Sequence, residues 1–226
     1  MQIAKNIKML TVDNMFPVLL WDDNSLALID TGYPRHTNEL IAAIADAGFD
    51  AKNLTHIILT HQDIDHVGCV SRLLEIAPNA KVYAHKEEAP YMDGTLTPIK
   101  LANAIADRSN QDPQKQAETD NNEKRFKEIH FPVHHKLEDG ELIDVAGGIV
   151  AVHTPGHSPG HICLYIKASE ILVLGDSAGV QDGELIDFNP IWVQDIPLAN
   201  QSLEKIIKPY SKKAVIGHHS GFTALK

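Results

Sequence analysis

The stretch Thr60-His61-Gln62-Asp63-Ile64-Asp65-His66 directly follows a short apolar run at residues 57–59. It carries four side chains of the kinds that bind metals: His61, Asp63, Asp65 and His66. Imidazole nitrogens and carboxylate oxygens are the usual protein ligands of zinc, iron and manganese. The first two of these residues can face one ion while the last two face another. The loop therefore predicts a metal site and indicates two ions, although histidine and aspartate at a strand end also cap helices and form turns.

Three further apolar runs end in the same way. Residues 149–152 lead into the loop that contains His157, residues 171–174 lead to Asp176, and residues 214–216 lead to His218. Continuous apolar runs of this length are typical of strands that are covered on both faces. If these strands end along one edge of the sheets, we expect their ligand-type residues to converge there, because ligand sites collect at such edges.

In their order and combination, these motifs resemble those of the metallo-β-lactamase-fold hydrolases. The motifs are His-x-Asp-x-Asp-His at 61–66, Thr-Pro-Gly-His-Ser-Pro-Gly-His at 154–161, Gly-Asp at 175–176, Gly-His at 217–218 and an early Asp-Thr-Gly at 30–32. The resemblance extends over about residues 16–219. It implies an α+β fold, an αββα sandwich in which two central mixed sheets are flanked by helices.

The resemblance also implies a ligand set for two ions. One ion would be held by His61, Asp63 and His157, a second by Asp65, His66 and His218, and Asp176 would bridge them. Other residues are expected around these ligands, either supporting them or lining a substrate pocket: Asp30, His161, Phe188, Trp192 and His219. Among these, Asp30 would orient a ligand imidazole and His161 would form hydrogen bonds. Either aromatic residue can instead belong to the core.

Asp63 departs from the family's usual motif, which has a histidine at this position. The flavodiiron proteins, a redox branch of the same fold, carry a glutamate there. A hard oxygen ligand in place of a nitrogen shifts metal preference toward manganese or iron and away from zinc. The alternative is a tolerated ligand exchange in an ordinary zinc hydrolase. The expected cofactors are therefore two divalent metal ions per chain, with zinc, manganese and iron as the candidates.

The function that the resemblance implies is hydrolysis of an ester-like bond, in a lactone, ester, thioester or phosphodiester, through a metal-bridged hydroxide. Asp65 would orient the nucleophile or accept its proton. One alternative is a diiron redox protein related to the flavodiiron branch, and another is a metal-binding protein without catalysis. Flavodiiron proteins receive electrons through a flavin domain, and the sequence after His218 is too short to contain one, so we expect hydrolysis.

The charge and hydropathy of the sequence exclude some classes of binding partner. The 226 residues carry a formal net charge of −10, which disfavours a nucleic-acid partner because such proteins need a basic face. No apolar run is long enough to span a membrane, and residues 1–10 do not resemble a signal peptide. We expect a cytoplasmic protein with a small-molecule substrate and leave a homodimer open. Cys69 and Cys163 are expected to be buried, not paired.

The chain is expected to form one domain over residues 1–226, with a lid or insert at about 86–132. Strands are predicted at 16–21, 25–29, 55–60, 81–84, 141–145, 149–154, 161–167, 171–175 and 213–217. Helices are predicted at 36–47, 67–77, 98–107 and 198–207, the last ended by Pro209. The polar residues 109–125 are interpreted either as a solvated loop or as an exposed helix.

Overall fold

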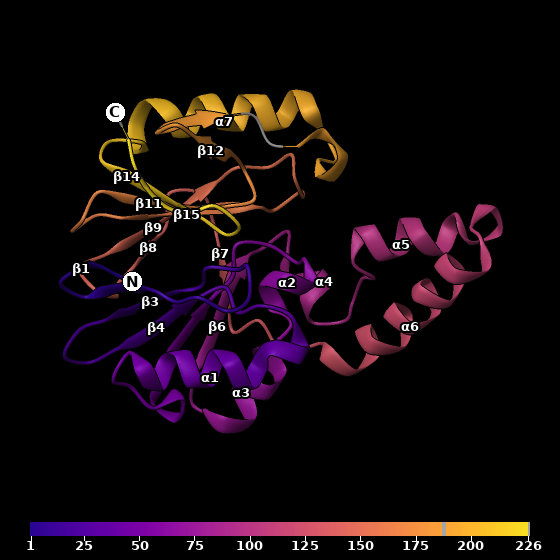
Figure 1. Ribbon diagram of the computed structural model, residues 1–226, viewed down its shortest axis with the longest axis horizontal. Helices are drawn as coiled ribbons and strands as arrows, with labels where there is room; N and C mark the ends of the chain where they lie inside the picture. Colours follow the sequence, from indigo (N-terminus) through magenta and orange to yellow (C-terminus); the bar gives the residue numbers. More distant parts are fainter. Residues whose placement is uncertain (187–188, 226) are drawn as a thin grey trace.

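The apolar runs form two large sheets that pack face to face in the computed structural model, which describes residues 1–186 and 189–225 (Figure 1). The first sheet follows the chain order: β1 (Gln2–Ala4), β2 (Ile7–Met9), β3 (Val18–Trp21), β4 (Leu26–Ile29), β5 (His56–Ile58), β6 (Lys81–His85) and β7 (His135–Leu137). The second has the spatial order β15 (Gly221–Ala224), β14 (Ala214–Gly217), β11 (Ile171–Gly175), β10 (Ile162–Ile166), β9 (Ile149–His153) and β8 (Leu142–Ile143). A separate hairpin pairs β12 (Gly179–Gln181) with β13 (Glu184–Ile186).

Alternation along the strands gives each sheet two apolar faces. In β4, Ala27 and Ile29 pack in the core between the sheets, whereas Leu28 packs in the core under the outer helices. In β9, Ala151 belongs to the core between the sheets and Val152 to the outer one. Because successive side chains of a strand point to opposite faces, a strand that is covered on both sides needs a continuous apolar run.

Helices cover the outer face of each sheet. They are α1 (Thr37–Asp46) and α3 (Val70–Ile76) on the first sheet and α7 (Ile196–Tyr210) on the second. The outer layers are visible on opposite sides of the sheets (Figure 1). Leu40 and Leu73 anchor the first pair of helices, and Ile206 anchors α7. The predicted fold, an αββα sandwich with two mixed sheets, is confirmed.

The last helix, predicted at about 198–207, extends slightly further at both ends, and the predicted stop before Pro209 was wrong. α7 starts earlier because the side chain of Asp195 accepts a hydrogen bond from the Leu198 backbone N–H and Pro197 occupies the first turn, a favourable helix start. It also continues through Pro209 to Tyr210. A proline in the last turn interrupts the hydrogen-bonding pattern only near the helix end, so it does not stop the helix before it.

The segment 86–132 is largely helical. It contains α4 (Ala89–Met92), α5 (Ile99–Ala106), η3 (Arg108–Asn110) and α6 (Pro113–Ile129). The helix predicted at 98–107 is confirmed as α5, and most of the polar run 109–125 forms the exposed helix α6. No helix in the described part of the chain is long and apolar enough to cross a membrane.

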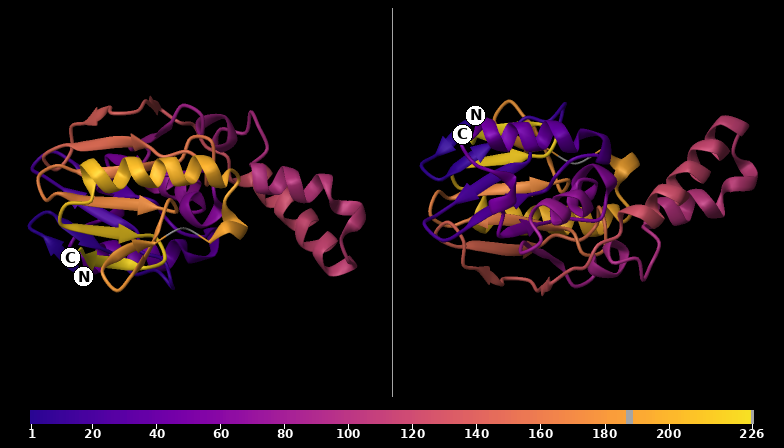
Figure 2. Two further views of the ribbon diagram at one scale, coloured as in Figure 1. Left: turned by 90° about the horizontal axis from the view of Figure 1, so that it is seen from above. Right: turned by 90° about the horizontal axis from the view of Figure 1, so that it is seen from below.

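α5 and α6 form a helical hairpin that projects sideways from the sandwich (Figures 1 and 2). Arg108 joins the two helices through ion pairs with Asp120 and Glu123 on α6. Thr119 Oγ1 also donates a hydrogen bond of 3.0 Å to Gln111 Oε1. Polar contacts therefore contribute to holding this hairpin together. Its action as a lid stays a prediction.

Gly175 ends β11 in the left-handed region, with φ +54°, directly before Asp176. A Cβ atom at this position would lie 2.6 Å from Nε2 of His161 and 3.0 Å from the Thr60 side chain. Both the backbone conformation and the close packing thus require glycine. The turn at Gly175 directs the chain into the strand-end region where the predicted ligands lie.

Gly175→Ala should lower the free energy of unfolding by about 3 kcal/mol, because the methyl group adds overpacking to the strain of the left-handed backbone. Gly140 is the matched control, since its φ is +79° and an added Cβ would meet no atom within 4 Å. Gly140→Ala should cost only about 1 kcal/mol. Urea denaturation measures both, and equal losses would show that packing at Gly175 contributes nothing.

Candidate metal centre

The strand ends marked by the sequence meet at one edge of the sandwich. β4, β5 and β6 run parallel in the first sheet, and β11 and β14 run parallel in the second. Within each sheet, the carboxyl ends of these parallel strands therefore lie at the same edge. The loops that carry the predicted ligands begin there. The short helix α2 (Ile64–Val67) begins inside the loop after β5 and fixes Asp65 and His66 within its single turn.

The first group of candidate ligands consists of His61, Asp63, His157 and Asp176. One potential ligand atom from each lies within 4.8 Å of all the others. Oδ2 of Asp63 is 3.2 Å from Nε2 of His61 and 2.9 Å from Nε2 of His157. The carboxylate that replaces the family's usual histidine therefore points into the group, between two imidazoles.

The second group consists of Asp65, His66, His218 and His219, again with ligand atoms within 4.8 Å of one another. Oδ2 of Asp65 is 3.0 Å from Nε2 of His219 and 3.8 Å from Nε2 of His66. His218 is buried and stacks on the His66 ring, whereas the His219 side chain is 42% exposed. Both neighbouring histidines reach this group, and the choice of His218 as the ligand stays a prediction.

Asp176 presents one carboxylate oxygen to each group. Its Oδ2 lies 3.8 Å from Nε2 of His157 and 4.0 Å from Nε2 of His61. Its Oδ1 lies 3.3 Å from Nε2 of His66 in the other group. A carboxylate placed in this way can contact a cation on either side, which is the geometry that a bridging role requires.

The site combines ionised carboxylates with imidazoles whose pKa values shift in opposite directions. Burial disfavours the charged form of His66, but Asp30, Asp176 and Asp65 hold its pKa well above the usual value. Burial disfavours ionisation of Asp63, but the imidazoles of His61 and His157 and the ammonium of Lys100 hold its pKa well below the usual range. Burial likewise opposes ionisation of Asp176, whose pKa is nevertheless held low by His66, His61 and His157. Burial, together with the His66 ring, lowers the pKa of His218 to about 3. A neutral imidazole keeps the lone pair that a metal ligand needs.

Asp30 fixes the orientation of His66. It has φ +55° at the end of β4, and its Oδ2 accepts a hydrogen bond of 2.9 Å from Nδ1 of His66. Its other oxygen accepts the Thr60 backbone N–H at 2.9 Å. Because Nδ1 is committed to Asp30, only Nε2 of His66 can face a cation, which is the usual arrangement around a metal-bound histidine.

His161 supports the site without joining either group. Its Nε2 accepts a hydrogen bond of 3.0 Å from the Asp176 backbone N–H. Burial, with the nearby imidazoles of His61 and His157, holds the pKa of His161 well below its usual value. The ring is therefore neutral and carries its proton on Nδ1, which donates to Thr154 Oγ1 at 2.8 Å. These two bonds fix the backbone that presents Asp176.

The donor set fits divalent cations. Nε2 of His61 and Nε2 of His66 are buried and make no well-aligned hydrogen bond within the described chain, although carboxylate oxygens lie 3.2 and 3.3 Å away. Buried polar atoms are normally satisfied, so each such atom needs an explanation. Two cations, each facing nitrogen and carboxylate donors, would satisfy both ring nitrogens and compensate the buried negative charge.

Two predicted pocket residues have different outcomes. Trp192, at the end of η4 (Pro190–Trp192), is 53% exposed, so its alternative placement in the core is excluded. Its ring lies beside the Lys100 ammonium, 5.5 Å from ring centroid to Nζ. Phe188 lies outside the described residues. Lys100 itself was not predicted from the sequence, where the one visible signal is a lysine within a largely apolar helical stretch.

Glu88 is a second contact residue that the sequence did not reveal. Its fully buried carboxylate accepts hydrogen bonds from the Gln62 backbone N–H at 2.9 Å and the Gln62 side chain at 3.0 Å. It also accepts from Ser158 Oγ at 2.7 Å and the Gly160 N–H at 2.8 Å. Glu88 thus connects the loop that carries His61 with the loop that carries His157.

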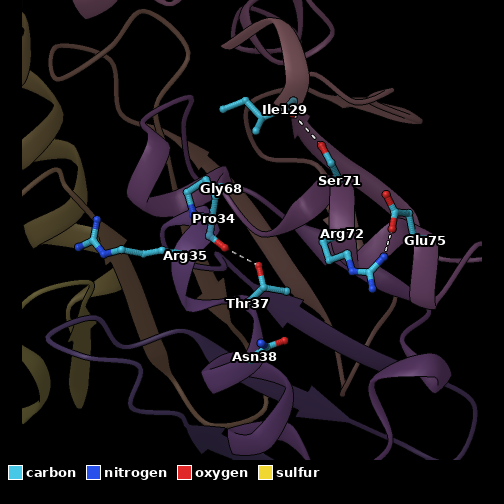
Figure 3. Close-up of a pocket in the computed structure, with 9 residues that line it drawn as sticks. All are labelled: Pro34, Arg35, Thr37, Asn38, Gly68, Ser71, Arg72, Glu75 and Ile129. Atoms are coloured by element: carbon cyan, nitrogen blue, oxygen red, sulfur yellow. Dashed lines mark hydrogen bonds and ion pairs between the residues drawn. The ribbon is translucent and has the colours of Figure 1, made fainter. Parts of the chain in front are cut away.

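A groove of about 340 Å³ lies elsewhere, beside α1 and α3, and includes none of the predicted metal ligands (Figure 3). Its lining includes Pro34, Thr37 and Arg72. In the close-up, Arg35 extends away from the neighbouring residues, and Arg72 is paired with Glu75. This groove is therefore separate from the candidate metal centre.

The family model of the metallo-beta-lactamase superfamily matches residues 11–218. The chain is 29% identical over 184 residues to the probable metallo-hydrolase YflN of Bacillus subtilis, covering 78% of this chain and 65% of that protein. It is 28% identical over 180 residues to an atrochrysone carboxyl ACP thioesterase of Aspergillus fumigatus, covering 79% of this chain and 42% of that protein.

Among solved structures, the chain resembles a metallo-beta-lactamase family protein from Thermus thermophilus with a TM-score of 0.76 and 21% identity. The superposition covers 99% of this chain and 76% of that one. At this level of identity, the likeness concerns the fold. The chain spans less than two thirds of the two curated relatives named above, so their whole activities are not transferred with the match.

Glu88→Gln should lower the free energy of unfolding by about 2 kcal/mol, because hydrogen bonds to a charged acceptor are lost and an amide NH₂ replaces one oxygen. It should also weaken metal binding, since both ligand loops lose a shared anchor. Glu87 is exposed and adjacent, so Glu87→Gln is the matched control and should change neither quantity. Urea denaturation and metal titration test this, and unchanged stability in Glu88→Gln would contradict the anchoring role.

Proposed function

Because this chain belongs to the metallo-β-lactamase superfamily, we propose that its two ligand groups hold two divalent cations and that it hydrolyses an ester-like bond, with thioesters as the substrate class. The observation that carries this proposal is the position of Asp176, whose two oxygens face one group each. A centre of this kind is suited to hydrolysis because two bound cations would supply Lewis acidity and an activated water.

At the level of reaction class, the prediction of a metal-dependent hydrolase is confirmed by the family and by the hydrolase names of its relatives. The number of ions and the kind of bond that is cleaved are finer statements than the reaction class, and both are proposals. In this proposal, His61, Asp63 and His157 hold one cation, and Asp65, His66 and His218 hold the other. Zinc, manganese and iron remain the candidate metals.

The chemistry follows from the donors. When bound, the cations supply Lewis acidity to the substrate carbonyl and lower the pKa of a water to about 7, so that it can act as the nucleophile. Oδ2 of Asp65 accepts the proton of that water as its oxygen attacks the carbonyl carbon. Nε2 of His219, 3.0 Å from Asp65, can carry the proton toward solvent. The carbon–sulfur bond then breaks and the sulfur leaves as a thiolate. A proton from solvent converts the thiolate to a thiol, so the products are a carboxylic acid and a thiol.

Thioesters are favoured over the other candidate bonds because one relative is named a thioesterase. A thiolate is also a better leaving group than an alkoxide, so less general acid is required from the protein. The substrate is proposed to be a small molecule. A cytoplasmic location and a homodimer stay predictions.

The test of this function begins with metal content. Protein purified without chelator should contain about two divalent ions per chain and should hydrolyse a thioester faster than ester, lactone and phosphodiester probes. Asp65→Asn should lower kcat by about 100-fold or more, because it removes the proton acceptor. Asp120→Asn, on the exposed face of α6, is the control and should leave kcat unchanged.

Each opposite outcome has a distinct meaning. Turnover that requires an electron donor or dioxygen would replace hydrolysis with diiron redox chemistry. Two bound ions without turnover on any probe would leave a metal-binding protein without catalysis. One ion per chain in active protein would overturn the dinuclear proposal.

Asp63→His should shift metal preference from manganese or iron toward zinc, because an imidazole nitrogen replaces a hard carboxylate oxygen. Asp63 points into the first group, so the exchange acts directly on the ligands. Competitive loading of metal-free protein from equimolar metals, followed by elemental analysis, measures the ratio. An unchanged ratio would mean that Asp63 does not contact the ion, and Asp120→Asn again serves as the control.

A further inference from the structure

The helical hairpin brings a lysine to the metal centre. α5 begins at Ile99, whose backbone N–H donates to Oε1 of Gln62 at 2.9 Å, and so the first turn of α5 is attached to the metal loop. The next residue, Lys100, forms an ion pair with Oδ2 of Asp63. Its Nζ is also 3.4 Å from Nε2 of His157. Lys100 thus contacts two of the four residues in the first group.

Lys100 stands out among the basic residues of the described chain, because no other described lysine or arginine forms a hydrogen bond or ion pair with a predicted metal ligand. Its side chain is 39% exposed, so its ammonium lies between the buried centre and solvent. The Lys100 Nζ also lies over the ring of Trp192, 5.5 Å from the ring centroid. The quadrupole of an aromatic ring attracts an ammonium to the ring face and thereby limits the positions that the Lys100 ammonium adopts.

Bound cations change the balance of charge around Lys100. The three carboxylates of the proposed ligand set, Asp63, Asp65 and Asp176, do not neutralise two divalent cations. The centre would therefore be positive while the bound water keeps its proton. With cations bound, Asp63 would face an ion, and its pairing with the Lys100 ammonium would weaken. The arrangement therefore leaves a positive group at the mouth of the site, where a negative group of the substrate can replace Asp63 as its partner.

We propose that Lys100 and Trp192 form an anion subsite beside the metal centre that selects substrates with a carboxylate a few bonds from the scissile carbonyl. This inference rests on the proposed thioester hydrolysis. Lys100 binds the carboxylate, and Trp192 positions the ammonium while its exposed face contacts the spacer between the two ends of the substrate. The neighbouring Ile191, 79% exposed, adds apolar surface for the same spacer.

The experiment compares two thioesters of the same shape. One is the S-ethyl monothioester of glutaric acid, and the other is S-ethyl 5-methylhexanethioate, in which a neutral isopropyl group replaces the carboxylate. Metal-loaded protein is assayed with both by release of ethanethiol. Wild type should prefer the anionic substrate by about tenfold or more in kcat/KM, as expected for a charge-assisted hydrogen bond.

Lys100→Met should abolish this preference, with the loss confined to the anionic substrate and located in KM. Lys100→Arg keeps the charge and should retain most of it. Lys115→Met removes an exposed lysine of α6 and should alter neither substrate. Trp192→Ala should weaken the anionic preference by about threefold, since it removes the cation–π contact.

A binding measurement makes the test independent of turnover. Calorimetric titration of the metal-loaded protein with glutarate should give about tenfold weaker binding to Lys100→Met than to wild type. Equal binding, or an equal loss on both thioesters, would overturn the anion subsite. If wild type hydrolyses neither thioester but still binds glutarate through Lys100, the proposed reaction fails while the subsite stands.

Discussion

Several buried carboxylates at one edge of the sandwich impose the constraint to which the rest of the site responds. Asp30, Asp63 and Asp176 lie within a few ångströms of the same imidazoles. Removing so many negative charges from water is costly unless each has a positive or hydrogen-bonding partner. The protein partners them with histidines, backbone N–H groups and one lysine. Cations between the carboxylates would complete this compensation.

Two carboxylates outside the ligand set, Asp30 and Glu88, position different ligand loops. Asp30 connects β4 to the metal loop through Thr60 and His66, and Glu88 connects the metal loop to the His157 loop through Gln62 and Ser158. These carboxylates need no ion, because the protein itself supplies their hydrogen bonds. The ligand loops are therefore fixed largely by groups outside the ligand set, which is how protein metal sites gain geometric precision.

Much of this could be predicted from the sequence, because the information was local. Each predicted ligand lies in the loop that follows an apolar run, and the order of the motifs identifies the fold. Glu88 could not be predicted, because it is adjacent to another glutamate, Glu87, and nothing in the local sequence distinguishes the two. Tertiary packing buries Glu88 and leaves Glu87 exposed. The end of α7 was missed because Pro209 acts as a stop signal in most contexts but is tolerated in a last turn.

Lys100 shows why substrate recognition was harder to predict than the metal centre. It lies 37 positions from Asp63 along the chain, on a helix outside the sandwich. The hairpin is attached to the rest of the protein at both ends. At the α5 end, the Ile99 backbone N–H donates to the metal loop. At the α6 end, Ser71 of α3 donates to the Ile129 carbonyl, and the Phe131 backbone N–H donates to the Met92 carbonyl of α4. Because Lys100 lies in the first turn of α5, next to the hydrogen bond from Ile99 to the metal loop, any displacement of this end of the hairpin changes the position of the ammonium relative to Asp63. In this proposal, the αββα core fixes the predicted ligands, while the hairpin sets the charge that a substrate meets.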